Sequence, residues 1–208
     1  MRDQNTPLVA REGILFIALA LALLAASLRF FDWWVTLVPL LATVMLILLF
    51  RDPRRQVPPV PLGVVSPVDG EVVDVDTTNR CVVQGEAYRV RIRIDALGTY
   101  SARSPIEGWV MDLRSKAEGV GADCPANALW IESDEGNSVV LQFHEYRFGL
   151  APKAFLQFGE RVGQGQRCAY IRLARYAEVY VPIGGRVKVE PGQRVLAGSD
   201  IIGTVPHP

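Results

Sequence analysis

Three arginines, Arg103, Arg172 and Arg175, are candidates for binding an anion. A guanidinium group presents a planar set of donors that matches a phosphate or a carboxylate with two parallel hydrogen bonds. Anion binding is therefore one chemistry that these positions could perform. The competing interpretation is that the three arginines lie on solvated strand faces and bind nothing.

Metal and disulfide chemistry are not predicted. The chain has three cysteines, Cys81, Cys124 and Cys168, which are widely spaced and form no CxxC pair, and its two histidines are His144 and His207. An odd number of scattered cysteines with so few imidazoles supports neither a disulfide framework nor a structural zinc site. No metal ligand set is therefore assigned.

The charge balance argues against a nucleic-acid partner. The chain contains 22 Lys and Arg against 22 Asp and Glu, and residues 1–50 hold three of each sign. A nucleic-acid-binding face requires an excess of positive charge, which this chain lacks. At 50% hydrophobic and 21% charged residues, the composition also excludes a disordered or collagen-like chain.

The hydrophobic residues are concentrated in the first fifty positions. Gly13 to Leu28 and Trp33 to Phe50 are free of charged residues, and Arg29 and Asp32 separate them. One long helix would place these two charges at the centre of the bilayer, at about 2.5–3.5 kcal/mol each, whereas a hairpin places them at its surface. We therefore predict a membrane anchor over residues 1–50 with two transmembrane helices, at about 13–31 and 33–50.

The flanking residues predict the orientation of this hairpin. Aromatic residues of the connection favour one membrane surface, and the arginines before the first helix and after the second favour the cytoplasmic surface. We expect the N-terminus and the C-terminal domain to face the cytoplasm from the inner membrane. A cleaved signal peptide is the alternative, but the second apolar run follows too closely for that pattern.

The chain changes character after the second apolar run. Residues 51–61 contain four prolines in eleven positions, which predicts a stiff linker. Beyond it, over residues 62–208, apolar and polar residues alternate between glycine-rich turns, a pattern typical of β-strands. Tyr88 to Asp95 is the clearest case, with arginines on one face of the expected strand and Val90, Ile92 and Ile94 on the other.

Two segments of this β-rich region share a design, Ser66 to Val75 and Val181 to Val205, each with a proline, a tight glycine turn and alternating valines. They are similar to the barrel-sandwich hairpins of lipoyl and biotinyl carrier domains. In those domains a modified lysine occupies a hairpin tip, but here Lys188 falls inside an expected strand. A carrier function is therefore disfavoured.

Four blocks in chain order suggest a family. They are FRDPRR (Phe50 to Arg55), SPVDG (Ser66 to Gly70), RSPIEGWV (Arg103 to Val110) and GERVGQGQRCAYIRLARYAEVYVP (Gly159 to Pro182). Together with the apolar hairpin, this order resembles the short bacterial phosphatidylserine decarboxylases, in which the blocks read approximately FFRDPxR, SPADG, VHVNRSPxDG and GERFGMIRFGSRVDVYLP. The resemblance implies a mainly-β, barrel-sandwich-like domain behind the transmembrane hairpin.

The resemblance also implies a reaction. Members of the family convert phosphatidylserine to phosphatidylethanolamine at the membrane surface with a pyruvoyl group made from their own chain. A serine attacks the carbonyl of the preceding glycine, the ester eliminates, and the resulting carbonyl serves as an electron sink for the carbanion left by carbon dioxide. An Asp-His pair of the family supplies the base for the serine.

This chain departs from the family pattern at the positions that carry the reaction. The Phe-Gly-Ser-Arg of the family falls on Leu173 to Tyr176, so that Ala174 and Arg175 replace the Gly-Ser pair, and the family histidine falls on Tyr100. Asp69 alone retains the family residue. We therefore expect no self-cleavage, no decarboxylase activity and no cofactor, a pyruvoyl group being expected only if the chain is active after all.

Other residues could in principle replace the missing groups. Gly198-Ser199 is an intact Gly-Ser pair, but it lies 24 residues beyond the family position, in an expected turn. His144 has the pattern of a strand-face residue more than that of a base. Neither Ser101 nor Ser104 follows a glycine, and Asp69 with its neighbouring glycine also fits a plain turn.

Three functions remain open for such a chain. The first is a non-catalytic relative in phospholipid metabolism that binds membrane phospholipid through Arg103, Arg172 and Arg175, or binds a catalytic homologue or a second copy of itself. The second is an active phosphatidylserine decarboxylase that forms its pyruvoyl group elsewhere, at Ser199. The third is a barrel-sandwich scaffold of a membrane complex.

Overall fold

The computed structural model describes residues 9–79, 86–114, 128–146 and 150–207. The chain divides into two compact units. The first contains Met1–Arg54 together with Ala96–Tyr100, and the second contains Arg55–Asp95 and Ser101–Pro208. Residues 52–60 contain neither helix nor strand.

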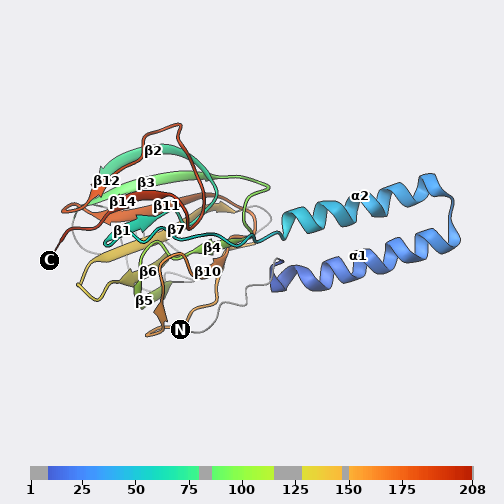
Figure 1. Ribbon diagram of the computed structural model, residues 1–208, viewed down its shortest axis with the longest axis horizontal. Helices are drawn as coiled ribbons and strands as arrows, with labels where there is room; N and C mark the ends of the chain where they lie inside the picture. The colour runs from blue at the N-terminus through green and yellow to red at the C-terminus, as the bar shows by residue number, and fades with distance from the viewer. Residues whose placement is uncertain (1–8, 80–85, 115–127, 147–149, 208) are drawn as a thin grey trace. The chain divides into compact units, whose positions relative to one another are not determined.

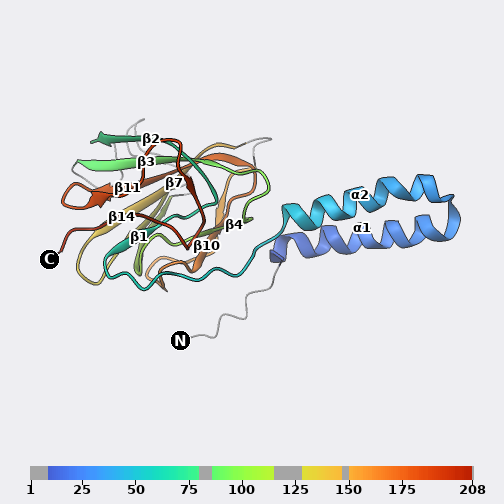
Figure 2. The ribbon, with the colours of Figure 1, turned by 45° about the horizontal axis from the view of Figure 1, so that its top comes forward.

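The first unit is a helical hairpin. Helices α1 (Arg11–Phe30) and α2 (Trp33–Leu49) run antiparallel and side by side (Figures 1 and 2). A buried hydrogen bond of 3.2 Å joins the Ser27 and Thr36 hydroxyl groups across the hairpin. The helix limits lie within two residues of the predicted ones.

The two helices differ in length. Glu12–Phe30 is a 19-residue apolar segment with a mean hydropathy of 2.3, long enough to cross a bilayer. Helix α2 is apolar throughout but has 17 residues, which corresponds to about 26 Å at 1.5 Å per residue. The hairpin and the mainly-β domain confirm the predicted fold class, with α1 the stronger candidate for a membrane span in the part of the chain that the structure describes.

The open end of the hairpin is closed by backbone contacts. The amide of Ala10 donates a 2.9 Å hydrogen bond to the carbonyl of Phe50, and Val9 forms an isolated antiparallel bridge with Arg51. Gly13 faces the Phe50 ring so closely that any Cβ atom would collide with it. A glycine is therefore required where the two helices meet.

The second unit is built from antiparallel strands. An eight-stranded sheet has the order β13-β2-β3-β11-β7-β6-β5-β9, and two three-stranded sheets have the orders β1-β14-β12 and β4-β10-β8. The strands are β1 (Gly63–Val65), β2 (Gly70–Thr78), β3 (Ala87–Ile94), β4 (Ser101–Arg103), β5 (Gly108–Arg114), β6 (Ala128–Glu132), β7 (Ser138–Tyr146), β8 (Lys153–Ala154), β9 (Arg161–Val162), β10 (Arg167–Tyr170), β11 (Ala174–Pro182), β12 (Arg186–Val187), β13 (Arg194–Val195) and β14 (Ile201–Thr204).

The core follows the alternation of the sequence. On β3, Val90 and Ile92 are fully buried, and on β11 the side chains of Ala177 and Val179 are fully buried as well. The intervening residues of both strands point to the opposite face of the sheet. That face carries the arginines that the sequence placed there, and it is not merely solvated, because Glu178 within it is only 2% exposed.

The two segments of similar design interlock. Strand β1 pairs with β14, and β2 pairs with β13, so the first and last strands of the domain lie together. The connection after β1 is held by the same partner segment, since Ser66 donates its amide to Asp200 and accepts one from Gly198, at 2.8 and 2.7 Å. This crossing places the SPVDG block against the Gly198-Ser199 turn.

Candidate functional site

Asp69 lies in the tight connection between β1 and β2 and is 5% exposed. One carboxylate oxygen accepts a 2.7 Å hydrogen bond from the amide of Ala197, and the other accepts a 2.9 Å bond from Nη2 of Arg55. Arg55 belongs to the FRDPRR block, so two of the sequence blocks meet here. Both oxygens are engaged in holding the chain, as expected for a structural carboxylate.

The Gly198-Ser199 pair occupies a turn directly beside Asp69. Gly198 has a φ of +69°, which favours glycine, and a Cβ atom there would lie 2.6 Å from Cδ of Arg103. The amide of Ser199 donates to the carbonyl of Leu196 at 3.1 Å. The sequence predicted a turn here but gave no sign that it would adjoin Asp69.

Ala174 and Arg175, which the sequence resemblance aligned with the self-cleaving pair of the family, begin strand β11. Ala174 is 8% exposed, whereas the side chain of Arg175 is 51% exposed and lies 3.5 Å from the carboxylate of Glu145. The guanidinium of Arg175 also lies 5.9 Å from the ring centre of Tyr176. Neither residue carries a hydroxyl that could attack a peptide carbonyl.

Tyr100, which the sequence resemblance aligned with the family histidine, belongs to the helical unit. Its hydroxyl donates a 3.0 Å hydrogen bond to Oε2 of Glu12, and its ring lies 4.7 Å from the ring of Phe50. Its amide donates to the carbonyl of Arg51 at 3.1 Å. Tyr100 therefore secures the base of the hairpin in place of an imidazole that could accept a proton.

The three candidate arginines do not share a partner in the described contacts. Arg103 is 3% exposed and donates to the carbonyl of Gly165 at 3.0 Å. Arg172, at a φ of +54°, donates to the carbonyl of Ala151 at 3.1 Å. Arg175 is the most accessible of the three and is therefore the best placed to meet a ligand from solution.

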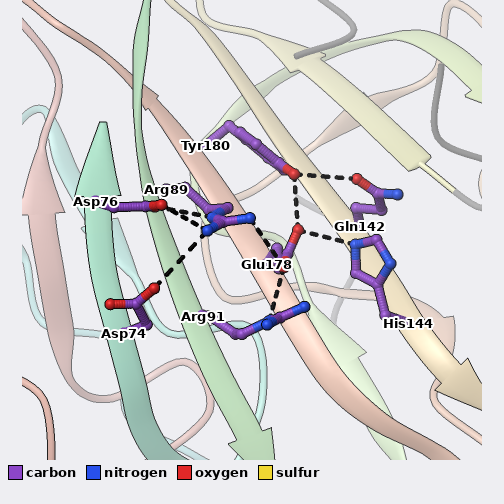
Figure 3. Close-up of polar contacts among 8 residues, drawn as sticks. All are labelled: Asp74, Asp76, Arg89, Arg91, Gln142, His144, Glu178 and Tyr180. Atoms are coloured by element: carbon purple, nitrogen blue, oxygen red, sulfur yellow. Dashed lines mark hydrogen bonds and ion pairs between the residues drawn. The ribbon is translucent and has the colours of Figure 1, made fainter. Parts of the chain in front are cut away.

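A polar network that the sequence analysis missed covers the outer face of the large sheet. Glu178 of β11 lies at its centre and is contacted by residues of the two neighbouring strands (Figure 3). Its Oε2 accepts hydrogen bonds of 2.8 Å from His144 and 2.7 Å from Tyr180, and its Oε1 lies 2.8 Å from Nε of Arg91. Arg89 extends the network to Asp74 and Asp76 on β2.

Burial by itself would raise the pKa of Glu178. Hydrogen bonds from His144 and Tyr180, together with the positive charge of Arg91, outweigh that effect and lower the pKa to about 2. Glu178 is therefore ionised throughout the physiological range and is held by donors from three strands. His144 is committed to this carboxylate, which leaves it a strand-face residue, as the sequence indicated.

The remaining reactive groups do not gather into a site. Cys168 is fully buried, and burial raises its pKa to about 12, so its thiolate is not populated at neutral pH. Cys81 and Cys124 lie outside the described residues. Among described residues, no group of three His, Cys, Asp or Glu side chains could hold a metal ion.

An open cavity of about 520 Å³ lies elsewhere on the β-rich unit. Its lining includes Val60 to Gly63, Glu107, Asp134, Glu135 and Gln164. None of its lining residues is a position of the decarboxylase reaction.

Comparison with known proteins identifies the family. The chain is 31% identical over 205 residues to the phosphatidylserine decarboxylase proenzyme of Nitrosomonas eutropha, covering 94% of both chains. It is 31% identical over 210 residues to the proenzyme of Burkholderia ambifaria, covering 94% of this chain and 95% of that one. The fold and the ordered sequence blocks thus have a common origin with these proteins: the chain belongs to the phosphatidylserine decarboxylase family.

Two further comparisons add no functional information. No family model matches the chain. A solved structure, glucose permease IIA from Mycoplasma capricolum, is 16% identical and aligns with a TM-score of 0.47 over 68% of this chain and 94% of its own.

Proposed function

We propose that this chain is a membrane-associated, non-catalytic member of the phosphatidylserine decarboxylase family that binds the anionic part of phospholipid headgroups. The observation that carries the proposal is the residue at position 175. An arginine that is 51% exposed stands where the family resemblance requires the self-cleaving serine. Its side chain cannot attack the carbonyl of Ala174, but it can bind a phosphate or a carboxylate.

The second support comes from the residues around that position. The pyruvoyl group that the family implies needs a Gly-Ser precursor, and Ala174-Arg175 does not fit it. Tyr100 carries a phenol engaged with Glu12 where the family carries its histidine. Ala174-Arg175 therefore cannot supply the pyruvoyl group that a decarboxylation at this position would need.

The intact mass of the purified chain tests the absence of self-cleavage. We expect one species at 22.9 kDa, without a carbonyl group that reacts with hydrazides. Incubation with phosphatidylserine should release no phosphatidylethanolamine. Two chains, the smaller with a blocked first residue, would overturn the proposal.

Retention of lipid tests the binding function. Protein purified in detergent should retain anionic phospholipids in native mass spectrometry, and Arg175→Ala should reduce that retention. Arg186→Ala is a matched control, because Arg186 is also an exposed strand arginine. Equal retention of anionic phospholipid by both variants would contradict a role for Arg175. If the chain instead stays associated with another protein after the lipid is removed, the scaffold alternative is supported.

One observation favours a second candidate, an active decarboxylase that forms its pyruvoyl group at Ser199. The Gly198-Ser199 turn adjoins Asp69, the retained family residue, through the amide of Ala197. Against this candidate, both oxygens of Asp69 are already hydrogen-bonded. If the wild-type chain is cut and Ser199→Ala is not, this second candidate is correct.

We infer that the N-terminus and the β-rich domain face the cytoplasm from the inner membrane. The arginines that flank the two helices support this orientation, because positive residues are enriched on the cytoplasmic side. A fluorescent protein fused after Pro208 should be bright, and a periplasmic phosphatase fused at the same position should be inactive. The opposite pair of results would reverse the orientation.

A further inference from the structure

Exposed apolar and basic side chains lie together along the edge strand β8 and beside β10. Leu150 is 46% exposed and Phe155 is 40% exposed, although both belong to a folded domain. Two basic residues lie near them: Lys153 two positions before Phe155, and Arg172, which is hydrogen-bonded to the carbonyl of Ala151. We call this set the β8–β10 surface, formed by Leu150, Lys153, Phe155, Tyr170 and Arg172.

The contacts within the β8–β10 surface show that it is ordered. The Phe155 ring packs at 5.0 Å against the ring of Tyr170, and Tyr170 lies opposite Lys153 in the pairing of the two strands. Arg172 binds the carbonyl of Ala151, the residue after Leu150, at 3.1 Å. Strand β10 lies beside β4 in both views of the molecule (Figures 1 and 2).

The charge of this segment is strongly one-sided. Residues 150–176 contain five Lys and Arg but only one acidic residue, Glu160, in a chain whose formal net charge is zero. Two of these five cations have acidic neighbours from other segments: Arg175 lies 3.5 Å from Glu145, and Arg161 lies 3.0 Å from Glu107 and 2.6 Å from Asp134. Such a surface complements a negatively charged partner.

A lipid bilayer is the partner that the chain itself brings close. Arg55 is held on Asp69 by a 2.9 Å bond, and α2 ends at Leu49. Five residues lie between these points, and the six steps from Leu49 to Arg55 can extend by at most about 20 Å, because an extended residue spans about 3.5 Å. Since α1 is long and apolar enough to cross a membrane, the β-rich unit cannot move far from the bilayer surface.

Exposed aromatic and aliphatic side chains beside basic residues are typical of surfaces that lie in the headgroup region of anionic membranes. We propose that the β8–β10 surface docks on an anionic lipid bilayer, with Leu150 and Phe155 entering the headgroup layer and Lys153 and Arg172 facing lipid phosphates. This inference goes beyond the binding of a single headgroup. It also holds whether or not the chain is catalytic.

Hydrogen exchange measured on the full chain tests the proposal. The chain would be placed in nanodiscs of phosphatidylcholine alone and in nanodiscs rich in phosphatidylglycerol. We expect the anionic lipid to slow exchange several-fold in peptides covering residues 150–156 and 168–172. Peptides from β3 and β7 should be unaffected and serve as an internal check of folding.

The double variant Lys153→Glu/Phe155→Ala should lose this protection. Its matched control is Lys188→Glu/Ile183→Ala, since Lys188 is also exposed and Ile183 is 39% exposed against 40% for Phe155. If the double variant fails the folding check, Lys153→Glu alone should still reduce the protection. Neither Lys153 nor Phe155 belongs to the proposed headgroup site, so failure here is distinguishable from failure of Arg175 to retain lipid.

Two results would overturn the docking proposal. The first is equal exchange of the β8–β10 peptides in both kinds of nanodisc. The second is protection that depends on protein concentration and not on anionic lipid, which would identify a protein contact instead. An equal loss of protection in the double variant and in its control would likewise show that the protection does not come from the β8–β10 surface.

Discussion

The hydroxyl of Tyr100 donates a 3.0 Å hydrogen bond to the carboxylate of Glu12, 88 residues earlier in the chain. The Tyr100 ring also packs at 4.7 Å against Phe50, which follows α2 at the same open end of the helical hairpin. Tyr100 thus connects the loop Ala96–Tyr100 to the start of α1 and to the end of α2.

The first prediction concerns this contact. Tyr100→Phe removes the hydrogen bond to Glu12 and keeps the ring, and a partly buried hydrogen bond is worth about 1 kcal/mol. For a chain of this length, that loss corresponds to a melting temperature lower by about 2–4 °C in detergent. Tyr100→His should lower it further, because the packing on Phe50 is also reduced, and should not produce decarboxylase activity.

Tyr88→Phe is the matched control for Tyr100→Phe. Tyr88 is half-buried on β3, and no hydrogen bond of its hydroxyl is recorded among the described residues. Its substitution should leave the melting temperature nearly unchanged. If Tyr88→Phe lowers the melting temperature as much as Tyr100→Phe does, the loss cannot be assigned to the hydrogen bond with Glu12. A gain of decarboxylase activity in Tyr100→His would contradict the structural role of Tyr100.

The second prediction concerns Glu178. Glu178→Gln keeps the size of the side chain but removes the charge that two arginines and His144 face, and breaking a buried ion pair costs about 3–5 kcal/mol. The melting temperature should fall by about 6 °C or more. Glu71→Gln is the control, because Glu71 pairs with Arg93 at 2.7 Å with side chains 35% and 56% exposed, and an exposed pair contributes little.

The third prediction follows from the pKa of Glu178. This pKa is lowered from 4.5 in the unfolded chain to about 2 in the folded one. The stabilisation is therefore complete above pH 4.5 and declines as the pH falls toward 2, because protons then bind the unfolded chain more tightly. The difference in melting temperature between wild type and Glu178→Gln should be smaller at pH 3 than at pH 6. A constant difference at all pH values would refute the assignment.

Much of the fold could be predicted from hydrophobic patterns. The uncharged runs on either side of Arg29 and Asp32 gave the two helices to within two residues. The alternation of Tyr88 to Asp95 gave the strand β3 and the face on which Val90 and Ile92 are buried. Local periodicity suffices here, because burial of one face is what forms each element.

The partners of polar residues could not be predicted in this way. Asp69 meets Ala197 across 128 residues and Glu178 meets His144 across 34, and such pairs depend on strand order, not on local pattern. The polar position of Glu178 within Ala177 to Val181 was visible in the sequence. What was not visible is that its neighbours on β3 and β7 supply the donors that make its burial tolerable.

The fourth prediction concerns Asp69. Asp69→Ala removes the acceptor of the Ala197 amide and leaves Arg55 without its 2.9 Å partner. Exchange of the amide of Ala197 should accelerate by at least about tenfold, because a lost hydrogen bond of about 1.4 kcal/mol corresponds to that factor. Asp69→Asn should have a smaller effect, since its amide oxygen can still accept from Ala197. Equal exchange in all three proteins would show that Asp69 does not hold the turn.

The fifth prediction concerns Cys168. The side chain is fully buried, its pKa is raised to about 12 by burial, and its thiol lies 3.5 Å from the carbonyl of Ala102. In a Cys81→Ser/Cys124→Ser background, a maleimide should therefore not modify the folded protein at pH 7.5. Denaturant should make the modification complete, because the thiol then regains its ordinary pKa and its access to the reagent. Rapid labelling of the folded chain would mean that the sheet β4-β10-β8 opens readily, and it would place Cys168 among the groups that could react.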